Sequence, residues 1–126
     1  MLAESRAFSG FAVDDLAKAH EFYAGTLGLD AELVDGGPGL MTIHLAGGRD
    51  TLVYLKPDFE PATCTILNFP VEDIDSAVDE LAAVGVEFER YDGTEQDEKG
   101  IARGPGPMIA WFKDPAGNIL AVLQGS

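Results

Sequence analysis

An internal repeat constrains this chain more than any other feature of its sequence. The letters VDDL at residues 13–16 return 58 residues later as VEDI at residues 71–74. Each copy follows an apolar run and precedes an amphipathic segment that stops at a glycine, Gly28 or Gly85. Two copies with so long a period do not make a solenoid. The repeat predicts one compact domain, residues 1–126, that is built from two similar halves and offers a binding cleft where the halves meet.

The composition narrows the classes of partner. The chain has 126 residues, enough for one domain that folds without disulfides. Its single cysteine, Cys64, has no intramolecular partner, which favours a reducing cytoplasm. No leader pattern opens the chain and no apolar run approaches about 18 residues, so we expect neither export nor a membrane partner.

The charge is strongly negative. Eight Lys and Arg residues stand against 22 Asp and Glu residues, for a net charge of −14. So few cations do not build the basic surface that a phosphate backbone requires, so no nucleic-acid partner is expected. A negative field attracts cationic ligands, although acidity also serves solubility or adaptation to salt.

The patterns of the two halves predict an α+β fold of two βαβββ modules, with both helices on one side of a curved mixed sheet. In the first module, residues 7–56, Asp14 or Asp15 caps a helix that ends before Gly28. In the second, residues 62–124, Asp73 caps the helix. The expected strands cover residues 8–13, 29–34, 40–45, 51–55, 64–71, 86–91, 108–112 and 119–123, with a glycine-rich turn at 36–39.

Three motifs carry a resemblance to a known family. They are VDDL followed by FY and LGL, the stretch FPVEDI at residues 69–74, and WFKDPAGN at residues 111–118, and they span residues 8–123 in order. With these motifs the chain resembles the vicinal oxygen chelate superfamily, which includes glyoxalase I, the bleomycin resistance proteins and the extradiol dioxygenases. The resemblance implies a glyoxalase-like fold, a small-molecule ligand and a homodimer.

The resemblance also implies four positions for metal ligands, two in each half. Counting from the motifs, these positions hold Phe8, Ile66, Ala121 and one of residues 52–54, where no carboxylate stands. Benzyl, alkyl and methyl groups do not donate lone pairs to a divalent ion. We therefore predict a metal-free cleft and no cofactor.

Strand alternation predicts the lining of that cleft. If Phe8 occupies a ligand-like position, Gly10 lies on the same face of its strand. In the second half, Ile66, Asn68 and Ala121 then point into the cleft. Asn68 is the leading candidate for a polar contact with the ligand. The alternative is that its side-chain amide hydrogen-bonds to neighbouring backbone groups of the sheet. The predicted ligand-binding set is Phe8, Gly10, Tyr54, Ile66, Asn68, Trp111 and Ala121, in which Tyr54 and Trp111 either stack on a ligand or fill the core.

For each of the other candidate residues, a structural or surface role is the alternative to a functional one. His44 is the one candidate for acid–base catalysis, or it is a hydrogen-bonded strand residue. Cys64 is interpreted as an idle or structural thiol. The polar segment 91–107 is a lid or an ordinary exposed loop, and its Arg103 meets a ligand anion or a surface carboxylate.

Two functions follow. The first is a cytoplasmic, metal-independent binder of an aromatic or cationic natural product. The second is a metal-dependent lyase, isomerase or dioxygenase with unusual ligands such as His44. A regulatory or interaction domain is neither supported nor excluded.

Overall fold

The computed structural model describes residues 1–34 and 39–125, so most of the predicted turn at 36–39 lies outside the described residues. The chain divides into two compact units, Met1–Phe59 and Glu60–Ser126. Each unit carries one copy of the repeat and is described by itself. Among the described residues, no helix is long and apolar enough to cross a membrane.

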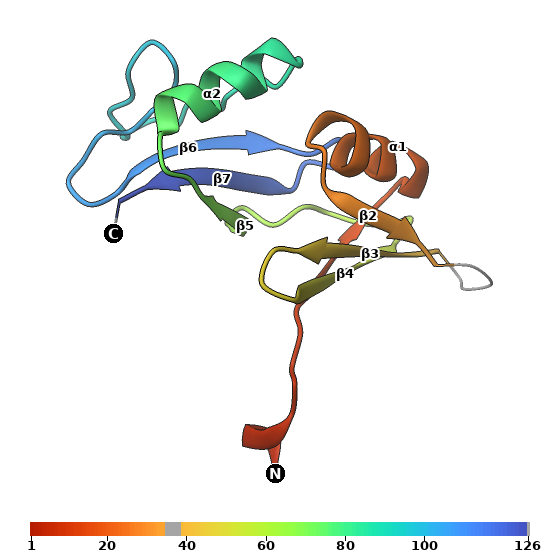
Figure 1. Cartoon of the computed structure of the whole chain (residues 1–126). Coiled ribbons are helices and arrows are strands. Elements are labelled where there is room, and N and C mark those ends of the chain that lie inside the picture. The colour runs from red at the N-terminus through yellow and green to blue at the C-terminus, as the bar shows by residue number, and fades with distance from the viewer. Residues whose placement is uncertain (35–38, 126) are drawn as a thin grey trace. The chain divides into compact units, whose positions relative to one another are not determined.

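The first unit follows the predicted order of strand, helix and three strands (Figure 1). Its strand order is β1-β4-β3-β2, with β1 parallel to β4 and the other pairs antiparallel. The elements are a short 3-10 turn Leu2–Glu4, β1 Gly10–Val13, α1 Leu16–His20, a π-helical turn Glu21–Thr26, β2 Asp30–Leu33, β3 Leu40–Leu45 and β4 Arg49–Leu55.

The helix of the first unit begins at Asp15, whose Oδ1 accepts the backbone N–H of Lys18 at 3.0 Å. It changes from α to π geometry at Glu21, so the predicted single helix has two parts. Tyr23 in the second part is fully buried, and its ring lies 5.7 Å from that of Phe11. The helix therefore covers the Phe11 face of the sheet.

The second unit repeats the topology with one strand fewer. Its elements are β5 Thr65–Pro70, α2 Ile74–Ala83, β6 Met108–Lys113 and β7 Ile119–Gln124, in the order β5-β7-β6. Strand β7 is parallel to β5 and antiparallel to β6. Figure 1 shows α2 lying over β6 and β7. Asp73 caps α2 by accepting the backbone N–H of Ser76 at 3.2 Å, 58 residues after the cap at Asp15.

The α+β class is confirmed: the described strands form two small mixed sheets, of four and three strands. One detail of the prediction is wrong. The strand expected at residues 86–91 is reduced to a single bridge between Phe88 and Phe112. The N–H of Glu89 still donates to the carbonyl of Trp111 at 2.8 Å. The side chain of Gln96 accepts the N–H of Tyr91 at 2.9 Å and the carbonyl of Glu89 accepts from that side chain at 2.8 Å, in place of further strand pairing.

The turn between β6 and β7 is held by a buried carboxylate. Asp114 Oδ1 accepts the backbone N–H groups of Ala116 at 3.0 Å and Asn118 at 2.8 Å, and Oδ2 accepts the Asn118 side-chain amide at 3.0 Å. Asp114 and Asn118 are 5% and 2% exposed. The predicted tight turn at this place is confirmed, and its hydrogen bonds fix the register of the hairpin.

Replacing Asp114 by Ala is expected to lower the free energy of unfolding by about 2–4 kcal/mol, because it leaves buried amide donors unpaired. Urea denaturation followed by circular dichroism measures the change. Asp92→Ala, on the exposed loop of the same unit, is the control and should change stability by about 0.5 kcal/mol or less. Equal effects in the two variants would contradict a structural role for the turn carboxylate.

Candidate functional site

A pocket of about 230 Å³ lies in the second unit. We call it the Tyr–Trp pocket. All three strands of the unit, the two residues before β5 and the segment after Phe88 supply its walls, which are uncharged. They are formed by Thr63, Cys64, Thr65, Tyr91, Trp111 and Ile119.

The sheet register places the aromatic wall. Trp111 on β6 lies opposite Ala121 on β7, and Ile119 lies two residues before Ala121 on the same face. Phe112 and its neighbour Phe88, with ring centroids 5.8 Å apart, belong to the other face. The ring of Tyr91 meets that of Trp111 edge to face, 5.4 Å away at an interplanar angle of 73°. The two rings therefore brace each other at the pocket.

A β-bulge shapes the opposite wall. The register between β5 and β7 runs from Thr65, opposite Ile119, directly to Leu67, opposite Leu120. Ile66 is the inserted residue, so Thr65 takes the place beside Ile119 that alternation assigned to Ile66. Bulges commonly redirect side chains next to functional sites. Sequence reasoning missed four pocket residues, Thr63, Cys64, Thr65 and Tyr91. Thr65 and Tyr91 were missed because neither a bulge nor a loop conformation is visible in strand periodicity.

The hydroxyl of Tyr91 is an unusual group beside the pocket. The oxygen is buried and has no hydrogen-bond partner among the described residues. Burial, followed by the nearby Glu89 carboxylate, raises the pKa of Tyr91, while Lys113 lowers it by a smaller amount. The phenol is therefore neutral near pH 7 and is a hydrogen-bond donor with an unused proton.

Three predicted ligand-binding residues share one row of this sheet. Asn68 and Trp111 both lie opposite Ala121, so all three are on the face that carries the Tyr–Trp pocket. Asn68 is exposed, Trp111 is half-buried and Ala121 is fully buried. Of the three, only Trp111 lines the pocket. A ligand contact for Asn68 and Ala121 stays a prediction.

The predicted residues of the first unit are spread more widely. Gly10, Tyr54 and His44 share the sheet face opposite Phe11. Phe8 precedes β1 and is 69% exposed. A Cβ on Gly10 would lie 2.8 Å from the carbonyl oxygen of Leu52, so glycine is required there by the close approach of β1 to β4. Tyr54 is 41% exposed on this face.

His44 lies in a row of acidic neighbours on the surface. Its Nδ1 is 2.8 Å from Oδ1 of Asp50, and its Nε2 is 3.9 Å from Oε1 of Glu32. The hydrogen bond to Asp50 raises the pKa of His44; burial opposes the shift, and the charges of Asp50, Asp30 and Glu32 add to it. Of the two predictions for His44, the structure shows the hydrogen-bonded strand residue, in an exposed ion pair with Asp50 on the neighbouring strand.

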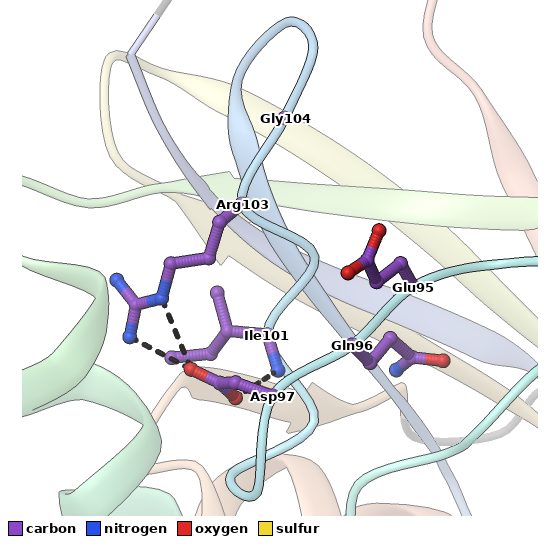
Figure 2. Close-up of a pocket in the computed structure, with 6 residues that line it drawn as sticks. All are labelled: Glu95, Gln96, Asp97, Ile101, Arg103 and Gly104. Carbon is purple, nitrogen blue, oxygen red and sulfur yellow. Dashed lines mark hydrogen bonds and ion pairs between the residues drawn. The ribbon is translucent and has the colours of Figure 1, made fainter.

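A larger pocket, of about 400 Å³, is formed by the loop after Tyr91. It is lined by Glu95, Gln96, Asp97, Ile101, Arg103 and Gly104 (Figure 2). The guanidinium of Arg103 is turned to Asp97, with Nη2 2.9 Å from Oδ2, and it also makes a two-pronged pair with Asp75 at 2.8 and 3.2 Å. The cation of this pocket is therefore already paired.

The ion pair of Arg103 with Asp75 also fastens the loop to α2. Asp97 Oδ1 accepts the N–H groups of Lys99 and Ile101, both at 2.9 Å. Partial burial opposes ionisation of Asp97, but the Ile101 N–H and Arg103 outweigh it and hold the pKa below its usual value. Lys99 adds a contact of 3.1 Å to Asp79 on the helix. Of the two predictions for Arg103, the surface ion pair is confirmed.

The donor chemistry expected of a metal site does not fit these residues. Within the described part of either unit, no three His, Cys, Asp or Glu side chains are placed so that they could hold a metal ion. The positions where the resemblance implies ligands bear Phe8, Ile66 and Ala121. No step through a metal is derived for this chain.

Comparisons with known proteins agree with this architecture. The family model for the Glyoxalase/Bleomycin resistance protein/Dioxygenase superfamily matches residues 7–122. A superfamily member from Sphaerobacter thermophilus DSM 20745 is 25% identical, with a TM-score of 0.71 over 98% of this chain and 100% of that one. No curated protein matches the sequence.

Two other structures have similar folds at lower identity. TnmS3, an antibiotic binding protein from Streptomyces sp. CB03234, is 23% identical, with a TM-score of 0.69 over 98% of both chains. Lactoylglutathione lyase from Agrobacterium tumefaciens is 23% identical, with a TM-score of 0.66 over 96% of this chain and 94% of that one. The chain belongs to the Glyoxalase/Bleomycin resistance protein/Dioxygenase superfamily.

Replacing Asp50 by Asn is expected to lower the pKa of His44 toward about 6.5, because it removes the largest cause of the raised value. A raised folded pKa means that the ion pair stabilises the fold below about pH 6.5, and that this contribution is lost as the pH rises through the folded value. An NMR titration of the imidazole checks the prediction. An unchanged pKa would mean that Asp30 and Glu32, and not Asp50, raise the pKa of His44.

Replacing Asp75 by Ala is expected to speed hydrogen exchange at the amides of residues 97–103, because Arg103 loses its anchor on α2. The free energy of unfolding should fall by about 1 kcal/mol or less, since the pair is exposed. Hydrogen–deuterium exchange with mass spectrometry resolves the loop. Asp79→Ala, which removes only a Lys99 contact, is the matched control, and equal exchange in both variants would contradict the anchor.

Proposed function

We propose that this chain is a small-molecule-binding member of its superfamily that holds an aromatic group of its ligand without a metal ion. The observation that carries the proposal is the Tyr–Trp pocket, where the two braced aromatic rings of Tyr91 and Trp111 line an uncharged cavity. Ligand pockets combine an apolar lining with a few placed polar groups. This pocket has that composition.

The size of the pocket indicates which part of a ligand it receives. Pockets for whole drug-sized molecules occupy about 300–1,000 Å³, and the Tyr–Trp pocket measures about 230 Å³. It therefore suits a group of one or two rings, with the rest of the molecule outside. The lining has no formal charge, whereas the net charge of the chain is −14, which favours the approach of a cationic ligand.

The proposed independence from metal rests on side-chain chemistry. In this superfamily, metal-dependent members are expected to carry His, Gln or Glu at positions where this chain has Phe8, Ile66 and Ala121. Without those donors, the protein has no side chains at these positions to bind a metal ion, and so no metal ion there to hold substrate oxygens. The names of similar structures include an antibiotic binding protein, so binding without chemistry is one use of the fold. We also propose that the protein is cytoplasmic, because it has a single cysteine, and that it is a homodimer, because dimers are common in the superfamily.

An enzyme is the second candidate, and one observation favours it. The 2.8 Å contact of His44 with Asp50 is the carboxylate–imidazole pair that orients many general bases. The pair is exposed in the first unit, and neither residue lines the Tyr–Trp pocket. Such an enzyme would lose its turnover when His44 is replaced by Ala with the fold intact.

Equilibrium dialysis with quinoline and N-methylquinolinium tests the binding proposal. Trp111→Leu is expected to weaken both by about three- to tenfold, because the ring contact is lost. Phe88→Leu removes a ring from the opposite face of the same sheet and should leave both affinities unchanged. As a second readout, bound quinoline should slow the alkylation of Cys64, the only cysteine, by iodoacetamide.

Two results would count against the proposal. One is equal weakening by Trp111→Leu and Phe88→Leu, which would reflect a general loss of stability. The other is an alkylation rate of Cys64 that does not respond to quinoline at concentrations where quinoline binds, which would place the ligand elsewhere.

A further inference from the structure

Backbone pairing with β6 stops just before Tyr91, the residue that supplies one aromatic ring of the Tyr–Trp pocket. The N–H of Glu89 donates to the carbonyl of Trp111 at 2.8 Å. Two residues later, the N–H of Tyr91 donates to the side chain of Gln96, and the carbonyl of Tyr91 accepts the N–H of Thr94 at 3.2 Å. The hydroxyl of Tyr91 has no hydrogen-bond partner among the described residues. Apart from its packing on Trp111, the ring therefore depends for its position on contacts within the loop.

The side chain of Gln96 makes the central contacts of that loop. Its Oε1 accepts the N–H of Tyr91 at 2.9 Å, and its Nε2 donates to the carbonyls of Glu89 and Gly100, both at 2.8 Å. The oxygen and both N–H groups of the amide are thus engaged with backbone. Gln96 is half-buried. A single amide therefore ties the backbone at Glu89 and Tyr91 to the far side of the loop.

The backbone beside Gln96 is itself held in place. Oδ2 of Asp97 lies 2.9 Å from Nη2 of Arg103. The guanidinium of Arg90 donates to the carbonyls of Asp97 and Glu98, at 2.7 and 2.6 Å. A side chain positions a neighbour precisely only when its own support is fixed. Gln96 has such a support.

We infer that Gln96 is a positioning residue of the Tyr–Trp pocket, which holds the ring of Tyr91 against Trp111 before a ligand arrives. This inference rests on the proposed function and adds to it the residue that orders the aromatic wall in advance. A wall that is already ordered loses no further freedom when a ligand binds. A mobile wall weakens the apparent affinity in proportion to the fraction of molecules in which the wall is in place.

Gln96→Met tests the inference, because it keeps an unbranched side chain and removes all three hydrogen bonds. Gln124→Met is the matched control: Oε1 of Gln124 accepts the N–H of Ile74 at 2.8 Å, and Gln124 does not line the pocket. Both substitutions should lower the Tm, by about 2–8 °C. In equilibrium dialysis well below the Tm, Gln96→Met is expected to weaken quinoline binding by about three- to fivefold, and Gln124→Met should leave it unchanged.

Two further readouts show whether Gln96 acts through Tyr91. Tyr91→Leu should weaken quinoline binding by about three- to tenfold, and adding Gln96→Met should weaken it no further, because the ring that Gln96 positions is gone. Trp111 is the only tryptophan of the chain, and the ring of Tyr91 lies 5.4 Å from it. In the unliganded protein, the indole N–H resonance of Trp111 should therefore shift in Gln96→Met and stay in place in Gln124→Met.

The outcomes separate the inference from the proposed function. If quinoline does not bind to the wild-type protein, the proposed function fails and the inference falls with it. If quinoline binds and Gln96→Met weakens it no more than Gln124→Met does, the inference is overturned and the proposed function stands. Independent effects of Gln96→Met and Tyr91→Leu, or an unshifted Trp111 resonance in Gln96→Met, also overturn it. If Gln96→Met does not fold, Gln96→Asn, which is one methylene shorter, takes its place with the same expected results.

Discussion

The placement of the last strand of each repeat between two others is the constraint on which the rest of the structure depends. Strand β4 pairs with β1 and β3, and β7 pairs with β5 and β6. One neighbour is parallel and the other antiparallel, so a single strand sets the register of both of its neighbours. In the second unit the buried Asp114 turn fixes β6 against β7, which places Trp111 opposite Ala121 and builds one wall of the Tyr–Trp pocket.

The pairing of charged groups distinguishes the larger pocket of the second unit from the Tyr–Trp pocket. Around the larger pocket, Arg103 meets Asp75 and Asp97, and the carboxylate of Asp97 also accepts backbone N–H groups. These charges stabilise one another and fasten a loop to a helix. The lining of the Tyr–Trp pocket is uncharged and includes the rings of Tyr91 and Trp111. Volume alone would favour the larger pocket as a ligand site, whereas the uncharged aromatic lining favours the smaller one.

Sequence patterns predicted the repeated elements because their causes are local. Asp15 and Asp73 cap helices through N–H groups three residues ahead, and the DPAGN turn closes on its own side chains. Alternation also placed Asn68 and Ala121 on one face correctly. It failed at Ile66, where the bulge shifts the register, and at residues 86–91, where Gln96 takes over the hydrogen bonds of an expected strand. Both failures come from contacts that strand periodicity does not encode.

The sequence by itself determined the family, the two-fold repeat, the helix caps and the lack of metal donors at the implied positions. These depend on residue identity and short-range spacing. Only the tertiary structure decided that Tyr91 joins Trp111, that Thr65 takes the place assigned to Ile66, and that Arg103 is paired. Each of these depends on residues that are distant in the chain or on a bulged register, and a hydroxyl becomes unpaired only when surrounding atoms exclude water from it.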